Sequence, residues 1–275
     1  MTVSPSTPLS LARPSRQSLA ALFTSLSRDS SGSAPRRWTL TRTLRSDNPN
    51  DINGELKGTA TFTLLRAQAT DGAETGPGPR VKEMVYKEEG EMPAAAVPGR
   101  GMQMAGLRWS KRYIWRLSDG GDDNDTGSGR GSAGEDGGIS VWFVKVSDKK
   151  KSTQTQTQVQ EEEEETDFLF HKFEFDSVRL EDASNTTATT STDDLVSPPE
   201  PPLPSSCSSP SSSGTTRKVQ TTILTARGNH LCINDLYRTA YAFRVRTDTG
   251  EVVSWTSRHV VRGPRKNQDI VNVYT

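Results

Sequence analysis

Apolar and polar side chains alternate along short segments that end at Gly, Pro, Asn or Asp. The segment from Trp38 to Arg45 shows the pattern, because Trp38, Leu40, Arg42 and Leu44 occupy the even positions and the odd positions are polar. A period of two residues is typical of a β-strand that buries one face. The pattern therefore predicts a strand here, with its even face toward a core.

The same alternation recurs along the chain, whereas helical periodicity is nearly absent. The predicted strands are Trp38 to Arg45, Leu56 to Leu64, Val81 to Met92, Met102 to Leu117, Ile139 to Val146, Asp167 to Asp176, Gln220 to Arg227, Leu236 to Arg246, Val252 to Val261 and Asn267 to Tyr274. Sequential strands without crossover helices predict an all-β antiparallel meander of about ten strands. We expect a closed barrel rather than a two-sheet sandwich, because closure removes both edges and leaves room for one small ligand.

Composition divides the chain into a folded domain and low-complexity segments. Hydrophobic residues make up 31% of the 275 residues, below the usual share of about 45–50% that also counts Gly. We predict a disordered tail over residues 1–17 and one barrel domain over 18–275, which begins with a short helix from Ser18 to Leu26. The domain carries low-complexity inserts at 118–138, 147–166 and 181–219. The last insert is rich in Pro and Ser, a composition expected to stay extended or disordered.

Charge and targeting signals restrict the partners. The 34 basic and 34 acidic residues balance, so bulk charge favours neither nucleic acid nor an anionic membrane as a partner. No apolar stretch is long enough for a membrane helix, and no secretory signal is present. We expect a cytoplasmic protein with no structural disulfide between Cys207 and Cys232. A mitochondrial location is the alternative, because the first 28 residues are serine-rich with Arg but no acid.

A series of short motifs carries a resemblance to a known family. In order they are Trp38-Thr-Leu-Thr-Arg42, Gly58-Thr-Ala-Thr-Phe62, Tyr86-Lys-Glu-Glu-Gly90, Arg112-Tyr-Ile-Trp-Arg116, Phe170-His171, His230-Leu-Cys232, Asp235-Leu-Tyr-Arg238 and Gly263-Pro-Arg-Lys266. Together they resemble an uncharacterised family of fungal and bacterial proteins, domain of unknown function 6314, over nearly all of the foldable residues. The resemblance implies a barrel but no reaction and no catalytic residue.

A looser likeness is to the calycin barrels, in which a tryptophan of the first strand closes one barrel end beneath an arginine. Trp38 matches that tryptophan, although Arg36 stands where lipocalins have a glycine. The likeness implies a calycin-like barrel around a ligand.

Arg42 is the most unusual residue of the predicted interior. A buried guanidinium is costly unless it is paired. Glu88, which shares a strand face with Tyr86, is one candidate partner, and an anionic group of a ligand is the other. Arg112 and Arg116 alternate with Tyr113 and Trp115 along one strand, so either the arginines or the aromatic residues point inward. We expect Tyr113 and Trp115 to be the inward pair.

Further candidates complete a polar and aromatic pocket. Tyr237 and Tyr241 share one face of their strand, and His171 and His259 lie in strands. The ligand-binding set predicted from the sequence is Arg42, Tyr86, Glu88, Tyr113, Trp115, His171, Tyr237, Tyr241 and His259. Arg262, Arg265 and Lys266 surround the turn at Gly263-Pro264, where we expect them to attract anions at one mouth of the barrel.

Metal and cofactor signals are weak. The three histidines lack the close spacing of a metal site, so we expect no metal and no cofactor, with haem as a minor alternative. His230 and Cys232 leave a strand on one side, yet no oxyanion-hole motif accompanies them.

The sequence favours a non-enzymatic barrel that binds a small amphipathic, anionic molecule. One alternative is an isomerase or hydrolase that uses His171 or His259 as an acid or base, with Arg and Tyr support. Another is an interaction scaffold that acts through the Pro/Ser-rich insert. The identity of the ligand and the oligomeric state are open at this point.

Overall fold

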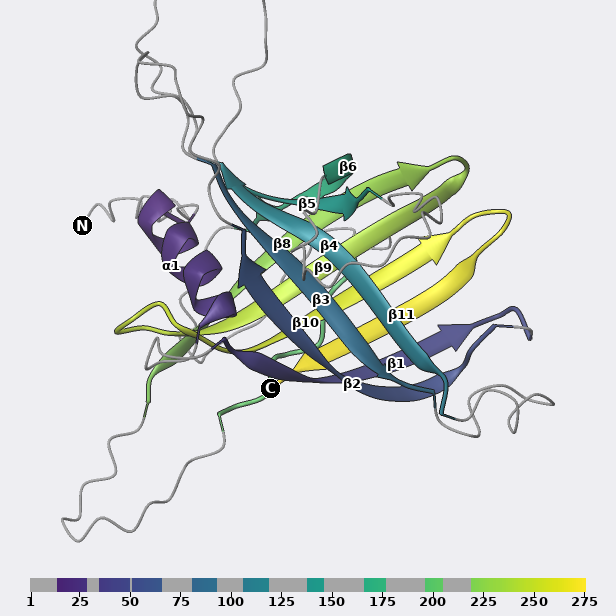
Figure 1. The fold of residues 1–275 in the computed structure, drawn as a ribbon, viewed down its shortest axis with the longest axis horizontal. Coiled ribbons are helices and arrows are strands. Elements are labelled where there is room, and N and C mark those ends of the chain that lie inside the picture. The colour runs from purple at the N-terminus through teal and green to yellow at the C-terminus, as the bar shows by residue number, and fades with distance from the viewer. Residues whose placement is uncertain are drawn as a thin grey trace, which may run out of the picture.

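A computed structural model describes residues 14–28, 35–49, 51–65, 81–92, 106–118, 138–145, 166–176, 196–204 and 219–275. Helix α1 (Arg16–Ser27) precedes eleven strands in these ranges (Figure 1). The strands are β1 (Arg37–Ser46), β2 (Gly54–Leu64), β3 (Val81–Glu91), β4 (Arg108–Ser118), β5 (Gly138–Val144), β6 (Thr166–Lys172), β7 (Glu174–Phe175), β8 (Thr221–Cys232), β9 (Asp235–Arg246), β10 (Val252–Arg262) and β11 (Asn267–Tyr274). The predicted tail and the first two inserts lie almost wholly outside the described residues.

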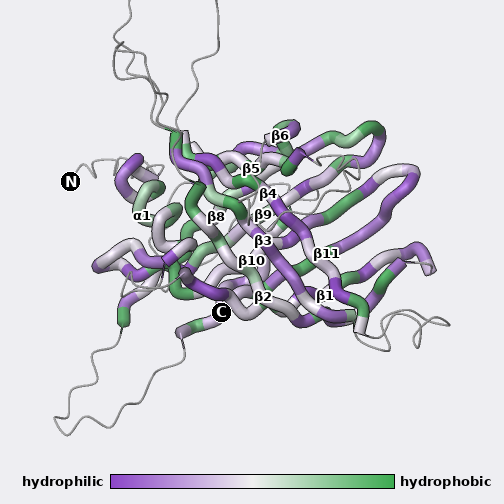
Figure 2. Tube along the Cα trace, in the orientation of Figure 1, coloured by the Kyte–Doolittle hydropathy of each residue, from purple (hydrophilic) through white to green (hydrophobic). Residues whose placement is uncertain are grey.

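All strands belong to one antiparallel sheet, whose order is β6-β5-β4-β3-β2-β1-β11-β10-β9-β8-β7. Sequential strands are neighbours, and β1 pairs with β11, so the meander curls back on itself. The all-β antiparallel fold predicted from alternation is therefore confirmed. Hydrophobic and hydrophilic residues are interspersed along the strands, as a barrel with one buried face requires (Figure 2).

One predicted strand divides between the two edges of the sheet. The segment expected to run from Asp167 to Asp176 forms β6, which pairs with β5, and then β7, which pairs with β8. Only Phe173 separates them, and its backbone N–H still donates to Ile139 on β5. This change of partner nearly closes the barrel and gives eleven strands instead of about ten.

Two strand boundaries also differ from the predictions. β8 continues to Cys232 instead of ending at Arg227, because Gly228, interpreted as a stop, lies within the β8–β9 ladder opposite Thr239. β4 begins at Arg108, whereas the predicted start at Met102 lies outside the described residues.

Helix α1 closes one end of the barrel. The Ser15 hydroxyl accepts a hydrogen bond from the Ser18 backbone N–H and caps the helix, which starts two residues before the predicted Ser18. Leu22 and Leu26 are fully buried in the same core as Trp38, whose indole N–H donates to the Leu26 carbonyl. Arg36 lies 3.9 Å above the Trp38 ring. The first-strand tryptophan thus seals this end, with an arginine over it.

Part of the Pro/Ser-rich insert packs on the barrel. Residues 197–204, here called the proline strap, lie against the outward side of β9 and β10. The Ser254 hydroxyl donates to the Pro202 carbonyl, and the Thr256 hydroxyl donates to the Pro199 carbonyl. This tract, expected to stay extended or disordered, is held against the barrel over these residues.

Candidate functional site

The barrel encloses a cavity of about 270 Å³ at the end opposite α1. Its lining includes Cys232 and Lys266, which stand beside the β8–β9 and β10–β11 turns. The helix instead packs at Trp38 and Val252, the other ends of β1 and β10. The cavity is therefore a pocket that is closed beneath by the core and approached from the turns.

Part of the cavity lining is apolar and aromatic. It consists of Trp115, Val141, Phe143, Phe170, Trp255, Val261 and Ile270. Trp255 stacks on Tyr274 with ring centroids 3.5 Å apart, and Trp115 meets Trp255 edge to face. These ring contacts hold this part of the lining rigid and offer apolar area to a ligand. Tyr113 and Trp115 point inward as predicted.

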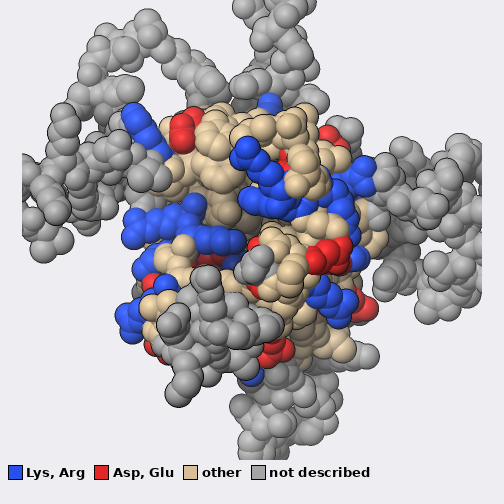
Figure 3. All heavy atoms as spheres, turned by 90° about the vertical axis from the view of Figure 1, so that its right-hand side faces the viewer, with Lys and Arg blue, Asp and Glu red and all other residues tan. Residues whose placement is uncertain are grey.

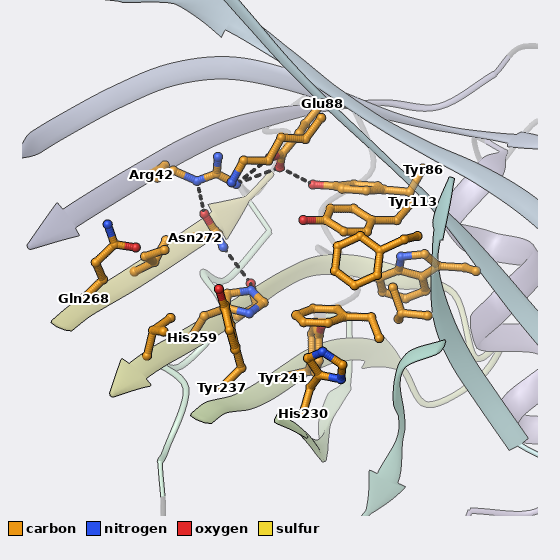
Figure 4. A pocket seen from close by; sticks show the side chains of 18 of the residues that line it. Arg42, Tyr86, Glu88, Tyr113, His230, Tyr237, Tyr241, His259, Gln268 and Asn272 are labelled. Carbon is orange, nitrogen blue, oxygen red and sulfur yellow. Dashed lines mark hydrogen bonds and ion pairs between the residues drawn. The ribbon is translucent and has the colours of Figure 1, made fainter. Parts of the chain in front are cut away.

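The polar part of the lining centres on an ion pair between Arg42 and Glu88 (Figure 4). Arg42 Nη2 lies 2.8 Å from Glu88 Oε1 and 2.7 Å from Oε2, and only 5% and 2% of the two residues are exposed. Burial opposes the charge of Arg42, but its interactions with Glu88, Tyr274 and Tyr86 together outweigh burial and raise the arginine pKa. Of the two partners expected for Arg42, the structure supplies the carboxylate.

The ion pair extends into a hydrogen-bonded network that follows cross-strand neighbours. Asn272 lies directly opposite Arg42 and accepts from its Nε at 2.6 Å. Asn272 donates to the Ser257 hydroxyl at 2.9 Å, and Ser257 is 3.1 Å from His259 Nε2. His259 Nδ1 is 3.1 Å from the Thr239 hydroxyl on β9. The network thus crosses β1, β11, β10 and β9.

Three tyrosines bring neutral hydroxyls to this polar part of the lining. Tyr86 donates to Glu88 Oε2 at 2.7 Å, and its hydroxyl is 2.8 Å from that of Tyr274. Burial, followed by the charge of Glu88, raises the pKa of Tyr86 and Tyr274 well above the ordinary value. The same causes raise the pKa of Tyr113 to about 12. These phenols are therefore uncharged hydrogen-bonding groups near neutral pH.

Two lysines stand at the cavity mouth, and Lys and Arg side chains gather around the hollow on this face (Figure 3). Lys111 lies directly opposite Glu88 on β4. Its partial removal from water, followed by the charge of Arg42, lowers its pKa. Lys266 Nζ donates to the Tyr237 hydroxyl at 2.7 Å, a contact that raises the lysine pKa. Because Arg42 and Glu88 cancel, these lysines leave the site positive.

The two predicted arginines of the mouth lie elsewhere. Arg262 bonds to the side chain of Asn267 and the Val261 carbonyl, and it is exposed outside the cavity lining. Arg265 is also exposed, and its backbone N–H donates to Asp235. Of the three predicted mouth cations, only Lys266 lines the cavity.

The predicted histidines occupy different positions. His259 lines the cavity, and burial, followed by the charge of His171, lowers its pKa well below the ordinary value. His171 lies behind the lining, where its Nε2 is 3.0 Å from the Tyr241 hydroxyl and its Nδ1 has no hydrogen-bond partner. Burial, followed by the charge of His230, lowers the pKa of His171 to about 3. Of the two predicted histidines, only His259 lines the cavity, where His230 joins it.

Comparison with known proteins adds one match. Residues 215–275 match the model of a family of unknown function, DUF6314. The DUF6314 match is narrower than the resemblance seen in the motifs, because it spans only β8 to β11. No curated protein matches the chain, and no solved structure matches it.

The DUF6314 segment supplies much of the cavity that the sequence analysis missed. Ser257, Gln268, Asn272 and Tyr274 all line it. Alternation was the available signal, since Ser257 shares a strand face with His259, and Gln268, Asn272 and Tyr274 share one face of β11. Outside the DUF6314 segment, Lys111 was missed although it shares a face with the predicted Tyr113 and Trp115.

The residues that the structure describes contain neither a metal-site cluster nor a membrane-spanning helix. No group of three His, Cys, Asp or Glu side chains within them has the arrangement of a metal site. Within the same ranges, no helix has the length and hydropathy needed to cross a membrane.

Proposed function

We propose that the barrel binds a small amphipathic molecule with an anionic end, and that binding rather than chemistry is its function. One observation carries the proposal. The cavity lining combines aromatic side chains with polar groups that already satisfy one another, with Lys111 and Lys266 at the entrance. A pocket that is largely apolar with a few convergent polar groups is typical of small-molecule binding.

The dimensions and charges of the cavity support a small, amphipathic ligand with an anionic end. A cavity of about 270 Å³ suits a small molecule rather than a long lipid. Glu88 neutralises Arg42. The anionic end would therefore meet the two lysines and Tyr237 at the mouth, while the apolar end lies against Trp115 and Trp255.

The test measures binding of octanoate and 1-octanol, which share a chain length and differ in charge, by isothermal titration calorimetry. Octanoate should bind more tightly than octanol. The Lys111→Gln/Lys266→Gln double variant should lose that preference and bind octanoate about tenfold more weakly, which corresponds to about 1.4 kcal/mol. Native mass spectrometry of protein from its own source then identifies the natural ligand.

Lys57→Gln/Lys87→Gln is the matched control, because both lysines pair with carboxylates outside the cavity lining. It should bind octanoate like the parent. The proposal fails if neither probe binds saturably and the protein from its own source carries no small molecule.

A second candidate function rests on the contact between Ser257 and His259. If His259 Nδ1–H donates to Thr239, its Nε2 accepts the proton of the Ser257 hydroxyl. The lowered pKa keeps His259 neutral, as a general base requires. This arrangement supports a hydrolase in which Ser257 attacks an acyl group and His259 takes its proton.

A fluorophosphonate probe separates the two functions. If the protein is a hydrolase, Ser257 should attack the phosphorus of the probe, fluoride should leave, and Ser257 should carry the phosphonyl group. Mass spectrometry should then detect this adduct in the parent, but not in Ser257→Ala or His259→Gln. A binding protein should remain unmodified. Ser254→Ala is the control, because Ser254 faces the strap rather than the cavity.

A further inference from the structure

The outward side of β9 and β10 carries a compact set of side-chain hydrogen-bond donors, namely Arg244, Ser254 and Thr256. Ser254 lies directly opposite Arg244, and Thr256 lies directly opposite Ala242. These residues point away from the cavity, because Phe243 and Trp255 alternate with them and belong to the core. Outward residues of a barrel are normally exposed, yet Arg244 is 5%, Ser254 2% and Thr256 0% exposed. Something must cover them.

The proline strap covers this surface and satisfies its donors. Arg244 Nε donates to the Pro201 carbonyl at 3.0 Å, and its Nη2 pairs with the Glu200 carboxylate. Ser254 and Thr256 donate to the Pro202 and Pro199 carbonyls, each at 2.5 Å. Proline-rich backbone forms no internal hydrogen bonds. Its carbonyls are thus free to accept from side chains, as they do here.

Over residues 197–203, exposure along the strap repeats every third residue. Ser197, Glu200 and Leu203 are exposed, whereas Pro198, Pro199, Pro201 and Pro202 are partly or fully buried. A polyproline II helix has three residues per turn, so one of its three rows faces solvent and the other two face the surface that binds it. The strap shows this pattern, with its proline rows toward the barrel.

The surface continues beyond the first residue of the strap. An open hollow of about 450 Å³ is lined by Ser197 and Pro198 together with Arg45, Arg258 and Asp269 from β1, β10 and β11. We call the surface beneath the strap, together with this adjoining hollow, the strap groove.

We propose that the strap groove is a binding site for proline-rich peptides in the polyproline II conformation, and that the chain's own Pro-Pro-Glu-Pro-Pro sequence occupies it. Arg244 selects for the acidic residue between the two proline pairs, while Ser254 and Thr256 bind backbone carbonyls. The prolines are therefore turned toward the barrel and away from proline-reading partners. The site is separate from the cavity, so its test does not depend on the proposed ligand.

The first experiment tests binding in trans. Residues 197–204 are replaced in the full-length protein by eight Gly and Ser residues, which preserves chain length. A fluorescent peptide with the sequence of residues 195–205 should bind this variant saturably in fluorescence anisotropy, and the parent at least tenfold more weakly, because its groove is filled. A peptide with arginine in place of Glu200, and the strap-replaced protein with Arg244→Ala, should each lose at least tenfold in affinity. A folded strap-replaced protein that does not bind the peptide overturns the proposal.

The second experiment uses the intact chain, so that it holds even if the strap-replaced protein does not fold. Pro201→Asp should lower the melting midpoint, because it places a charge at a buried strap position. Pro204→Asp is the matched control, since Pro204 belongs to the same tract and is exposed. Equal midpoints for both variants and the parent would show that the strap is not bound, and would refute the inference.

Discussion

At the scale of single residues, Arg42 shows how a charge is kept inside a barrel. Its Nη2 donates to both carboxylate oxygens of Glu88, and its Nε donates to the side-chain oxygen of Asn272. Tyr86 adds a further donor to the carboxylate. A buried ion pair is tolerated when the remaining hydrogen-bonding positions are filled in this way, and it is costly to break.

Arg42→Leu should lower the free energy of unfolding by about 3–5 kcal/mol, because it leaves the Glu88 carboxylate buried without its cation. The Arg42→Leu/Glu88→Leu double variant should recover most of that loss. Chemical denaturation of the parent and the two variants measures both effects.

Arg246→Leu is the control, since the pair of Arg246 with Asp248 is exposed, and it should leave the denaturation midpoint unchanged. An Arg42→Leu protein as stable as the parent would contradict the structural role, and would instead favour a ligand anion as the partner of Arg42.

At the scale of elements, closure of the barrel depends on the close approach of β6 and β8. β6 belongs to one edge of the sheet, and β8 pairs with β7 near the other. A Cβ atom at Gly228 on β8 would lie 2.2 Å from Cδ2 of His171 on β6, well inside contact distance. Glycine in a strand often marks such an approach.

Gly228→Ala should therefore destabilise the protein by about 1–3 kcal/mol, the usual cost of overpacking. His171→Ala removes the ring that the new methyl group meets. The Gly228→Ala/His171→Ala double variant should then be no less stable than His171→Ala alone, as judged by denaturant midpoints. Additive losses would show that the two strands do not meet at this position.

At the scale of the whole molecule, the buried histidines make stability depend on pH. An unfolded histidine binds a proton below about pH 6.5, whereas burial, followed by the charge of His230, lowers the pKa of native His171 to about 3. Between these values the unfolded state holds one more proton than the native state. The stability that His171 contributes is therefore complete above pH 6.5 and falls as the pH drops toward 3, by about 1.4 kcal/mol per pH unit.

His171→Gln should remove this dependence. Between pH 6 and pH 4 the free energy of unfolding of the variant should fall less steeply than that of the parent. The two slopes should differ by about 1.4 kcal/mol per pH unit. Denaturant titrations at several pH values give the two slopes, and the difference between them cancels the contribution of the carboxylates. Parallel curves would mean that native His171 titrates like an unfolded histidine.

The sequence alone determined the strands, most of their inward faces and the short helix. Trp38 and Arg42 were assigned to the interior correctly because the period of two is a local property that burial imposes on each strand. Arg42 could also be matched to Glu88, since a buried cation needs an anion and few candidates share an inward face. Part of the cavity lining, including Tyr86, Tyr113 and His259, followed from the same reasoning.

The tertiary structure alone decided how these strands meet. Asn272 and Ser257 join Arg42 to His259 only because the registers of β1, β11 and β10 place them directly opposite one another. His171 was misplaced because its strand changes partners at Phe173, which moves it behind Tyr241. The strap was missed because its low-complexity composition says nothing about a surface 43 to 57 residues further along the chain. Local periodicity fixes which way a side chain points, but only contacts between distant residues fix what it touches.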